Sequence, residues 1–279
     1  MTRLDLAGKT VVITGGASGI GLALAEQMAL RGAKPAILDV DGEKAGAQAA
    51  RIGGGAIGAA ADVTDAAALR RAIDQVAATQ GGIDVLVANA GIYPRLGSVD
   101  SGREEEHART LSVNLHGVIH TVRAGVPHLL ASRGHLVVMS SVAAFVPVPG
   151  AGAYAMSKAA VEALARAARI ELASTGVTVG VTHFGQVDTP LIAGLAADPL
   201  FVLPKPMRAR ARPEDVAQAL ARGIERRAAR TIYPRIYLPQ YALRGVLGPI
   251  ADELMVRLPA SRRVFRQLRT RDQVEESTR

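Results

Sequence analysis

Short apolar runs alternate with longer alanine-rich segments along most of this 279-residue chain, and this alternation constrains the fold more than any other feature. Runs that are apolar almost throughout are typical of parallel strands covered on both faces. Six such runs are Thr10–Thr14, Pro35–Asp39, Ala56–Ala60, Asp84–Ala88, His135–Ser140 and Val177–Thr182. Segments at helical spacing lie between and after them, at Ile20–Arg31, Glu43–Arg51, Ala66–Ala78, Glu104–Leu130, Ala153–Ala173 and Pro213–Arg227. The order predicts right-handed βαβ units in one α/β domain, a Rossmann-type doubly wound parallel sheet of about seven strands with helices on both faces.

The alternation stops in two places. Thr189–Arg212 is a proline-containing insertion, and Tyr233–Arg279 is a tail with a helix-like start at Leu243. We therefore expect one domain over residues 1–232 that includes the insertion 189–212, and a C-terminal extension over 233–279 that packs on this domain or on a neighbouring subunit. Pro249 and Pro259 are expected to break any helix in the extension, because proline lacks the backbone N–H that a helix interior uses.

The positive charge is concentrated near the C-terminus. Residues 205–279 hold 17 Lys/Arg and 8 Asp/Glu, a net charge of +9, whereas residues 1–204 are close to neutral. A basic segment can bind nucleic acid, a membrane surface or an acidic partner. No nucleic-acid motif or interleaved aromatic residues accompany this charge, so a solvated arginine-rich surface is favoured and no nucleic-acid partner is expected.

Composition limits the location and the chemistry. The chain has no cysteine, which excludes disulfides, thiolate catalysis and Cys-ligated zinc. No apolar run reaches the ~20 residues of a membrane span, and Met1–Lys9 has no apolar signal region. These features predict a cytoplasmic protein without a membrane span. His116 and His120 are four residues apart, but no third ligand accompanies them, and we expect no functional metal.

A glycine-rich turn connects the first predicted strand to the first predicted helix. Thr14–Gly21 reads TGGASGIG. Glycine allows the tight turn and the close approach of a pyrophosphate, and the start of the helix offers free N–H groups. No Lys-Ser/Thr pair follows, so an ATP-type loop is not predicted. The turn therefore favours a dinucleotide cofactor, with Gly15, Ser18, Gly19, Ile20 and Gly21 as its binding residues.

Asp39 ends the second predicted strand, eighteen residues after Gly21. A carboxylate at this position can accept hydrogen bonds from the adenosine ribose and repel a 2′-phosphate, which favours NAD(H) over NADP(H). A helix-capping carboxylate is the alternative interpretation of Asp39.

Ser141, Tyr154 and Lys158 form the pattern that most directly indicates chemistry. Tyr154 and Lys158 are four residues apart on a predicted helix and share one face. A neighbouring ammonium lowers the pKa of a tyrosine, which is otherwise near ~10, and a serine hydroxyl can hold a substrate oxygen. Taken alone, the tyrosine–lysine pair is equally typical of a structural pair on a surface helix.

Together these motifs make the chain resemble the short-chain dehydrogenase/reductase family over about residues 6–232. The resemblance rests on motifs in the family's order: Thr14–Gly21, Asp62-Val63, Asn89-Ala90-Gly91, Asn114, Ser141 and Tyr154-Ala-Met-Ser-Lys158. It implies that Tyr154 is the acid/base, that Ser141 orients the substrate oxygen and that Lys158 also binds the nicotinamide ribose. It further implies that Asn114 holds a water on a proton path from Lys158.

The resemblance also implies further cofactor contacts. Asp62 and Val63 would contact the adenine, and Asn89, Ala90 and Gly91 would line the adenosine ribose. The family's Pro-Gly-x-x-x-Thr stretch is matched at Gly185 and Thr189, but Phe184 replaces the proline. We expect Val187 and Thr189 to meet the nicotinamide carboxamide, and Phe184 to change the nearby loop or pocket wall.

These observations predict an NAD(H)-dependent oxidoreductase that interconverts a secondary alcohol and a ketone or aldehyde. The resemblance implies that the insertion 189–212 covers the substrate as a lid. Its apolar residues favour a lipophilic substrate or serve ordinary packing: Leu191, Ile192, Leu195, Leu200, Phe201, Val202, Leu203 and Met207. The family resemblance implies a homotetramer or homodimer. The alternative function is a non-catalytic NAD(H) sensor whose basic tail binds a partner, but a sensor has no need of Asn114, Ser141, Tyr154 and Lys158 together.

Overall fold

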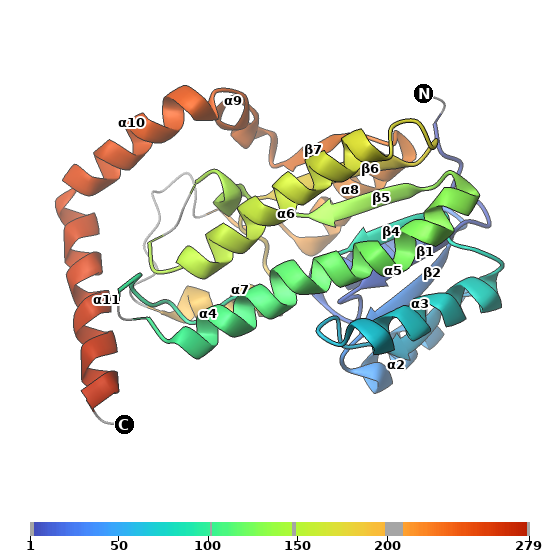
Figure 1. Cartoon of the computed structure of the whole chain (residues 1–279), viewed down its shortest axis with the longest axis horizontal. Coiled ribbons are helices and arrows are strands. Elements are labelled where there is room, and N and C mark those ends of the chain that lie inside the picture. The colour runs from blue at the N-terminus through green and yellow to red at the C-terminus, as the bar shows by residue number, and fades with distance from the viewer. Residues whose placement is uncertain (1–2, 101, 147–148, 199–208, 278–279) are drawn as a thin grey trace.

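A seven-stranded sheet, parallel throughout, forms the centre of the molecule, as the sequence predicts (Figure 1). The computed structural model describes residues 3–100, 102–146, 149–198 and 209–277. The strand order is β3-β2-β1-β4-β5-β6-β7, so the order reverses between β1 and β4. The strands are β1 (Thr10–Thr14), β2 (Lys34–Asp39), β3 (Ile57–Ala60), β4 (Val85–Ala88), β5 (His135–Met139), β6 (Thr178–Phe184) and β7 (Arg230–Tyr233).

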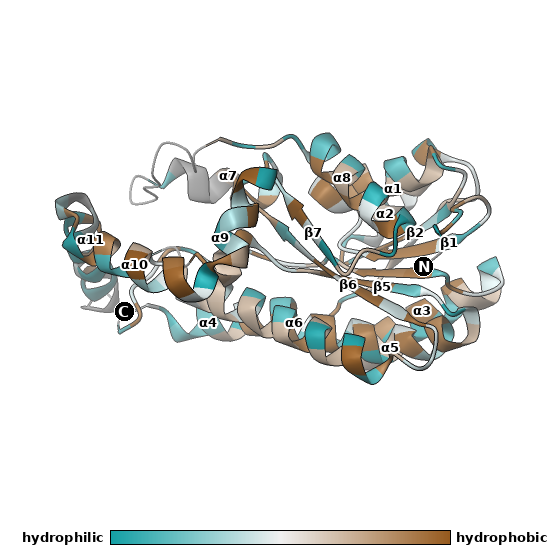
Figure 2. Cartoon of the chain, turned by 90° about the horizontal axis from the view of Figure 1, so that it is seen from above, coloured by the Kyte–Doolittle hydropathy of each residue, from teal (hydrophilic) through white to brown (hydrophobic). Residues whose placement is uncertain are grey.

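Helices cover both faces of the sheet (Figure 2). On one face lie α1 (Gly19–Ala29), α2 (Gly42–Ile52) and α8 (Pro213–Glu225). On the other lie α3 (Ala66–Gln80), α5 (Gly117–Ser132) and α6 (Gly152–Glu171). Each face has its own buried apolar core, one around Val11, Ile13 and Leu24 and the other around Val12, Leu86 and Leu136. Neighbouring strand residues thus point to opposite faces, which explains why the strands are apolar throughout.

One predicted helix has an internal irregularity. The segment predicted as Glu104–Leu130 consists of α4 (Glu104–Leu111), a π-helical turn over Ser112–His116, and α5. Single π turns inside helices frequently occur at functional sites. This turn contains Asn114, one of the candidate site residues.

Two elements were not predicted. The edge strand β7 is only four residues long and none of its residues is fully buried, so it lacks the continuous apolar pattern of the inner strands. Helix α7 (Pro190–Ala197) lies within the predicted lid. Two 3₁₀ turns, Val142–Ala144 and Arg235–Tyr237, complete the connections.

The C-terminal extension is helical and curves around one end of the molecule (Figure 1). It contains α9 (Leu238–Ala242), α10 (Arg244–Arg257) and α11 (Pro259–Ser277). The prediction that Pro249 breaks the helix is wrong, because Pro249 lies inside α10. An interior proline removes one helix hydrogen bond, and here the residue is exposed to solvent, so the helix adapts without disturbing a core. Pro259 does separate two helices, since α11 begins there.

Within the described ranges, no helix combines the length and the apolar character required to cross a bilayer. The same residues hold no group of three or more His, Cys, Asp or Glu side chains arranged to bind a metal. His116 is exposed, and Nδ1 of His120 lies 2.9 Å from the carbonyl oxygen of Val63, so this helical histidine pair has a structural contact instead.

Candidate active site

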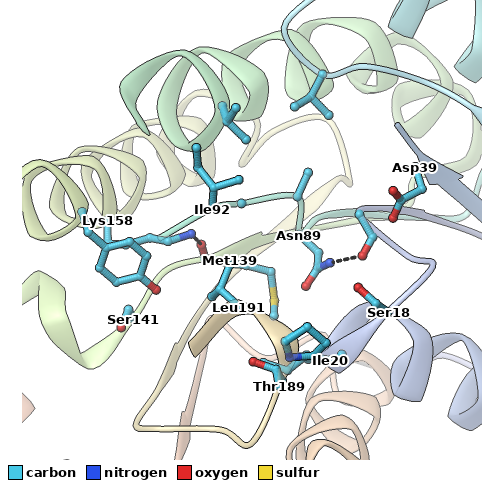
Figure 3. A pocket seen from close by; sticks show the side chains of 18 of the residues that line it. Ser18, Ile20, Asp39, Asn89, Ile92, Met139, Ser141, Lys158, Thr189 and Leu191 are labelled. Atoms are coloured by element: carbon cyan, nitrogen blue, oxygen red, sulfur yellow. Dashed lines mark hydrogen bonds between the residues drawn. The ribbon is translucent and has the colours of Figure 1, made fainter. Parts of the chain in front are cut away.

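A cavity of about 610 Å³ opens at the carboxyl ends of the strands, where the strand order reverses. Ligands of open α/β sheets bind at this kind of position. In Figure 3, Asp39 and Ser18 lie at one end of the cavity and Lys158 and Ser141 at the other. The sequence motifs for the cofactor and for the chemistry therefore belong to one continuous site.

The glycine-rich turn is packed so closely that two of its glycines have no room for a side chain. Gly15 has φ +64°, and a Cβ added to it would lie 2.7 Å from the Cα of Ala90. A Cβ on Gly21 would lie 2.4 Å from the carbonyl oxygen of Gly15. Ser18 is the N-cap of α1, and its side chain makes no capping hydrogen bond. The turn and the free helix start fit a dinucleotide phosphate.

Asp39 lies at the end of β2 and lines the cavity. Its Oδ2 accepts a hydrogen bond from the backbone N–H of Ala17 at 3.0 Å, and its Oδ1 accepts one from Asp41 at 3.2 Å. The carboxylate is thereby held beside the glycine-rich turn. It is not the N-cap of α2, because Asp41 has that role and accepts from the backbone N–H of Lys44.

Asn89 connects the end of β4 to the glycine-rich turn. Its Nδ2 donates to the carbonyl oxygens of Thr14 and Gly15, both at 2.9 Å. Ala90 and Gly91 follow it along the cavity wall. Asp62 and Val63, after β3, also line the cavity, and Asp62 Oδ1 accepts hydrogen bonds from both the backbone and the hydroxyl of Thr64.

The chemical end of the cavity brings together Ser141, Tyr154 and Lys158. Tyr154 and Lys158 lie one turn apart on α6, and both are buried. Lys158 Nζ donates to the carbonyl oxygen of Met139 at 3.0 Å and lies 5.6 Å from the centroid of the Tyr154 ring. Ser141 Oγ accepts from the backbone N–H of Ala143 at 3.1 Å, which orients the hydroxyl. An alcohol or carbonyl oxygen could be held here between two hydroxyl groups.

Burial dominates the electrostatics of this pair. It raises the pKa of the Tyr154 phenol, and the hydroxyl of Ser141 only partly opposes this change. Burial also lowers the pKa of Lys158 to about 8. The expectation that Lys158 lowers the pKa of Tyr154 thus differs from the structure, because both charged forms lose solvation in the same buried site.

Asn114 lies behind the cavity lining. The side chain is fully buried in the π-helical turn, where Oδ1 accepts from the N–H of Ile92 at 2.7 Å and Nδ2 donates to the carbonyl oxygen of Ile92 at 2.9 Å. Nδ2 also lies 3.3 Å from Ser157 Oγ. Its observed contacts therefore fix the strand-end loop against α6.

Phe184 changes the wall where the family has proline. The side chain is buried in the core beside Met139 and Val187, while its carbonyl oxygen accepts a long 3.5 Å hydrogen bond from Ser141 Oγ. Val187 and Thr189 both line the cavity, as does Gly185. A Cβ on Gly185 would lie 2.7 Å from the ring of Tyr237, so the C-terminal extension requires glycine here.

The cavity also contains residues that the sequence motifs did not predict. They include Ile92, Arg109, Ser112, Val113 and Met139. Ile92 immediately follows the Asn89–Gly91 motif, and that adjacency could have identified it. Among the apolar residues predicted for the lid, Leu191 and Ile192 line the cavity, whereas the side chain of Leu195 and residues 200–203 and 207 lie outside what the structure describes.

Comparisons with known proteins show the family of this chain. A family model for short chain dehydrogenases matches residues 9–199. The chain is 37% identical over 218 residues to cis-4-hydroxycyclohexanecarboxylate dehydrogenase of Sinomonas cyclohexanicum, covering 76% of this chain and 88% of that protein. It is 40% identical over 201 residues to 1-deoxy-11-beta-hydroxypentalenate dehydrogenase of Streptomyces avermitilis, covering 70% of this chain and 74% of that protein.

Two solved structures show the same fold with different cofactors. A 3-ketoacyl-(acyl-carrier-protein) reductase from Brucella melitensis, complexed with NADH, matches with a TM-score of 0.75 and 28% identity over 82% of this chain and 97% of that chain. A short chain dehydrogenase from Burkholderia cenocepacia in complex with NADP matches with a TM-score of 0.73 and 35% identity over 82% and 96%.

Proposed function

Because this chain belongs to the short-chain dehydrogenase family, an oxidoreductase family that uses a nicotinamide cofactor, we propose that it interconverts a cyclic secondary alcohol and the corresponding ketone with NAD(H). The single observation that carries the proposal is the meeting of Ser141, Tyr154 and Lys158 at the end of the dinucleotide-sized cavity opposite Asp39. Tyr154 lies on α6 and Ser141 follows β5, so both side chains are held by rigid elements.

The cofactor, when bound, accepts or supplies a hydride. Gly15, Ser18, Gly19 and Ile20 would hold its phosphates, with Gly21 supporting the turn from behind the cavity lining, and Asp62, Val63 and Asn89–Gly91 would hold its adenosine. Val187 and Thr189 would bind its nicotinamide end. These assignments are supported by the absent Cβ atoms of the glycine-rich turn and by the continuous cavity that connects these residues.

The protein's own groups would move the proton. In reduction, the Tyr154 phenol donates its proton to the carbonyl oxygen while the Ser141 hydroxyl donates a hydrogen bond to the same oxygen. In oxidation, the Tyr154 phenolate accepts the alcohol proton. Lys158, whose Nζ lies 5.6 Å from the centroid of the Tyr154 ring, would bind the nicotinamide ribose, and the network of Asn114 and Ile92 keeps the neighbouring loop in position.

NAD(H) is favoured over NADP(H) by Asp39. Its carboxylate lines the cavity beside the glycine-rich turn, where it would accept hydrogen bonds from the ribose hydroxyls. A 2′-phosphate at the same position would face a negative charge.

A cyclic substrate is favoured by the relatives and by the apolar cavity end. The two relatives described above are named for cis-4-hydroxycyclohexanecarboxylate and 1-deoxy-11-beta-hydroxypentalenate. Here the reaction site is walled by Ile92, Leu191 and Ile192, which suits an apolar ring. A non-catalytic sensor is disfavoured, because it has no need of Ser141, Tyr154 and Lys158 together at the reaction end of the cavity.

The direct test is to follow nicotinamide absorbance with NAD and NADP side by side against cyclohexanol, substituted cyclohexanols and linear secondary alcohols. We expect turnover of the cyclic alcohols with preference for NAD. Preference for NADP would contradict the role of Asp39, and turnover of linear alcohols alone would contradict the substrate class. Cofactor binding without turnover of any alcohol or ketone would favour the sensor.

A further inference from the structure

Helix α11 of the C-terminal extension packs behind the wall of the candidate substrate site. Leu268 is 1% exposed and shares a buried apolar cluster with Leu96, Ala151 and Tyr154. Ile192, which lines the cavity, packs against the same cluster. The wall therefore has an inner layer that includes Tyr154 and Ile192 and an outer layer that includes α11.

Polar contacts fix α11 to the two segments that flank this wall. Arg271 Nη1 pairs with Asp198 Oδ2 at 2.9 Å, directly after α7, and Arg271 Nη2 donates to the carbonyl oxygen of Leu96. The buried carboxylate of Asp272 accepts a hydrogen bond from the backbone N–H of Ser98 at 2.7 Å. One turn of α11 thus joins the end of α7 to the loop that follows β4.

A second, largely apolar cavity of about 640 Å³ lies on the other side of Leu268. It is open to solvent and is lined by the loop Ser98–Asp100, by Gly150 and Gly152, and by residues of α10 and α11 such as Met255 and Phe265. Leu268 belongs both to the lining of this cavity and to the cluster that contains Tyr154. The side chain is therefore part of the partition between the two spaces.

We propose that α11 sets the upper size of the substrate, with Leu268 as a specificity-determining residue and Arg271 as a positioning residue. The inference rests on the proposed function and narrows it to compact alicyclic alcohols and ketones. A bulky ring substituent directed toward the wall contacts Tyr154 and Ile192. These side chains cannot move away from it, because Leu268 fills the space behind them. The family model ends at residue 199, so α11 lies outside the matched segment.

The test measures binding without turnover. Calorimetry in the presence of NAD⁺, which cannot reduce a ketone, compares the affinities for cyclohexanone and 4-tert-butylcyclohexanone. An apolar pocket typically discriminates about 10-fold or more against added carbon groups, so we expect the wild-type protein to prefer cyclohexanone by about that factor. In Leu268→Ala the preference should fall to below about 3-fold, because the partition loses its core side chain.

Control variants separate this effect from general loosening of the extension. Leu254→Ala makes the same change at a position of α10 that is 59% exposed, and it should leave the preference unchanged. Arg271→Met should lower the affinity for both ketones by about 5-fold, because the hydrogen bonds of a charged group are lost. The affinity for NAD⁺ should stay constant, because these bonds lie far from the cofactor. Arg263→Met, at an exposed position of α11, should change neither the affinity for the ketones nor the affinity for NAD⁺. If Leu268→Ala does not fold, Leu268→Val provides the same comparison with a smaller change.

The outcomes are distinguishable. A ketone preference that is the same in the folded Leu268 variant as in the wild type would overturn the inference, as would an Arg271→Met protein with wild-type affinities. Failure of the wild-type protein to bind either ketone would overturn both the inference and the proposed substrate class. Binding with the expected pattern, but no reduction of either ketone when NADH replaces NAD⁺, would support the role of α11 and overturn the proposed function alone.

Discussion

The ring of Tyr93 lies against the ring of Tyr154, with 4.4 Å between the ring centroids and 33° between the planes. Tyr93 follows the Asn89–Gly91 motif by two residues and packs on the apolar cluster that contains Tyr154. Burial raises the pKa of Tyr93 far above its ordinary value, with a smaller contribution from Tyr154, so this second phenol stays neutral. Tyr93 therefore supports the candidate acid/base from one side without competing for its proton.

Replacing Tyr93 with leucine should lower kcat/KM by about 10-fold, because an aromatic pair contributes about 0.5–1.5 kcal/mol beyond its buried area. The affinity for NAD should stay unchanged, since Tyr93 does not line the cofactor cavity. Steady-state kinetics and cofactor titration of Tyr93→Leu check this, with Tyr93→Phe as the variant that retains the ring. A loss as large in Tyr93→Phe would mean that the hydroxyl, and not the ring contact, is what matters.

Tyr154→Phe should lower kcat by about 10²–10⁴-fold, the usual contribution of a positioned acid or base. Cofactor binding should persist, because the phosphate and adenosine contacts are unaffected. Tyr233→Phe removes a tyrosine hydroxyl on β7, away from the reaction end of the cavity, and should retain full turnover. Turnover by Tyr154→Phe at the wild-type rate would contradict the mechanism.

Lys158 should make the stability of the protein depend on pH. Its folded-state pKa of about 8 is depressed below the ordinary 10.5, so between these values the unfolded chain binds more protons than the folded one. The free energy of unfolding therefore rises with pH in this window. Relative to Lys158→Met, the wild-type protein should gain about 2 kcal/mol between pH 7 and pH 9.5. Denaturant unfolding of both proteins at the two pH values measures this, and a constant difference would contradict the depressed pKa.

Asp39→Ala should weaken NAD binding by about 10- to 100-fold, the range expected when a hydrogen bond to a charged group is lost. It should also strengthen NADP binding, because the repulsion of the 2′-phosphate disappears. Asp41→Asn keeps an N-cap side chain on α2 and removes a nearby charge, so it distinguishes a specific contact from the general field. If Asp39→Ala and Asp41→Asn had the same ratio of NAD affinity to NADP affinity, Asp39 would not be the residue that determines cofactor preference.

Glu162 should anchor the C-terminal extension to α6. Its buried carboxylate lies 2.8 Å from Arg244 Nη1 and 3.1 Å from His183 Nε2, and it accepts a hydrogen bond from Tyr241. Burial acts to raise the pKa of Glu162, but the hydrogen bonds from His183 and Arg244 outweigh it and hold the pKa at about 2. Glu162→Gln should destabilise the protein by about 2 kcal/mol near neutral pH.

The pH dependence of the stability lost in Glu162→Gln shows whether the ionised carboxylate of Glu162 is responsible. Because the folded-state pKa of Glu162 is depressed from 4.5 to about 2, its contribution is complete above the unfolded value and disappears as the pH falls through this window. The difference between the wild-type protein and Glu162→Gln should therefore shrink below about pH 4. Glu253→Gln, which removes an exposed ion pair on α10, should have little effect at any pH.

The sequence predicted the sheet well where the chain itself carries the signal. Five strands are apolar runs with mostly buried side chains, and β3 is an apolar run without a fully buried residue; all six positions were predicted to within two residues. The edge strand β7 and helix α7 lack such a signal, the first because it is short and partly exposed, the second because it is apolar all round. Five residues of π helix at Ser112–His116 cannot be distinguished from an α helix by periodicity, and only coordinates reveal them.

The candidate site also contains residues that could be predicted from the sequence and residues that could not. Motif residues such as Asp39, Asn89 and Tyr154 could be found because their chemistry requires particular side chains at fixed places along the chain. Two motif residues, Gly21 and Asn114, do not line the cavity but lie behind its lining. Leu268 and Arg271 had no motif to identify them, because they approach the site from a segment more than a hundred residues after Tyr154. Long-range packing of this kind depends on the whole fold.

The position of α9–α11 after the edge strand β7 bears on how the substrate specificity of such a chain can evolve. The sheet and the glycine-rich turn are complete before the extension begins, and the extension reaches the substrate end of the cavity, not the end that contains Asp39. Under the proposal that α11 sets the substrate size, mutations in the extension would alter which molecule is accepted and would leave the glycine-rich turn and Asp39 unchanged. The extension is a natural segment to randomise or exchange in directed evolution toward new alcohols.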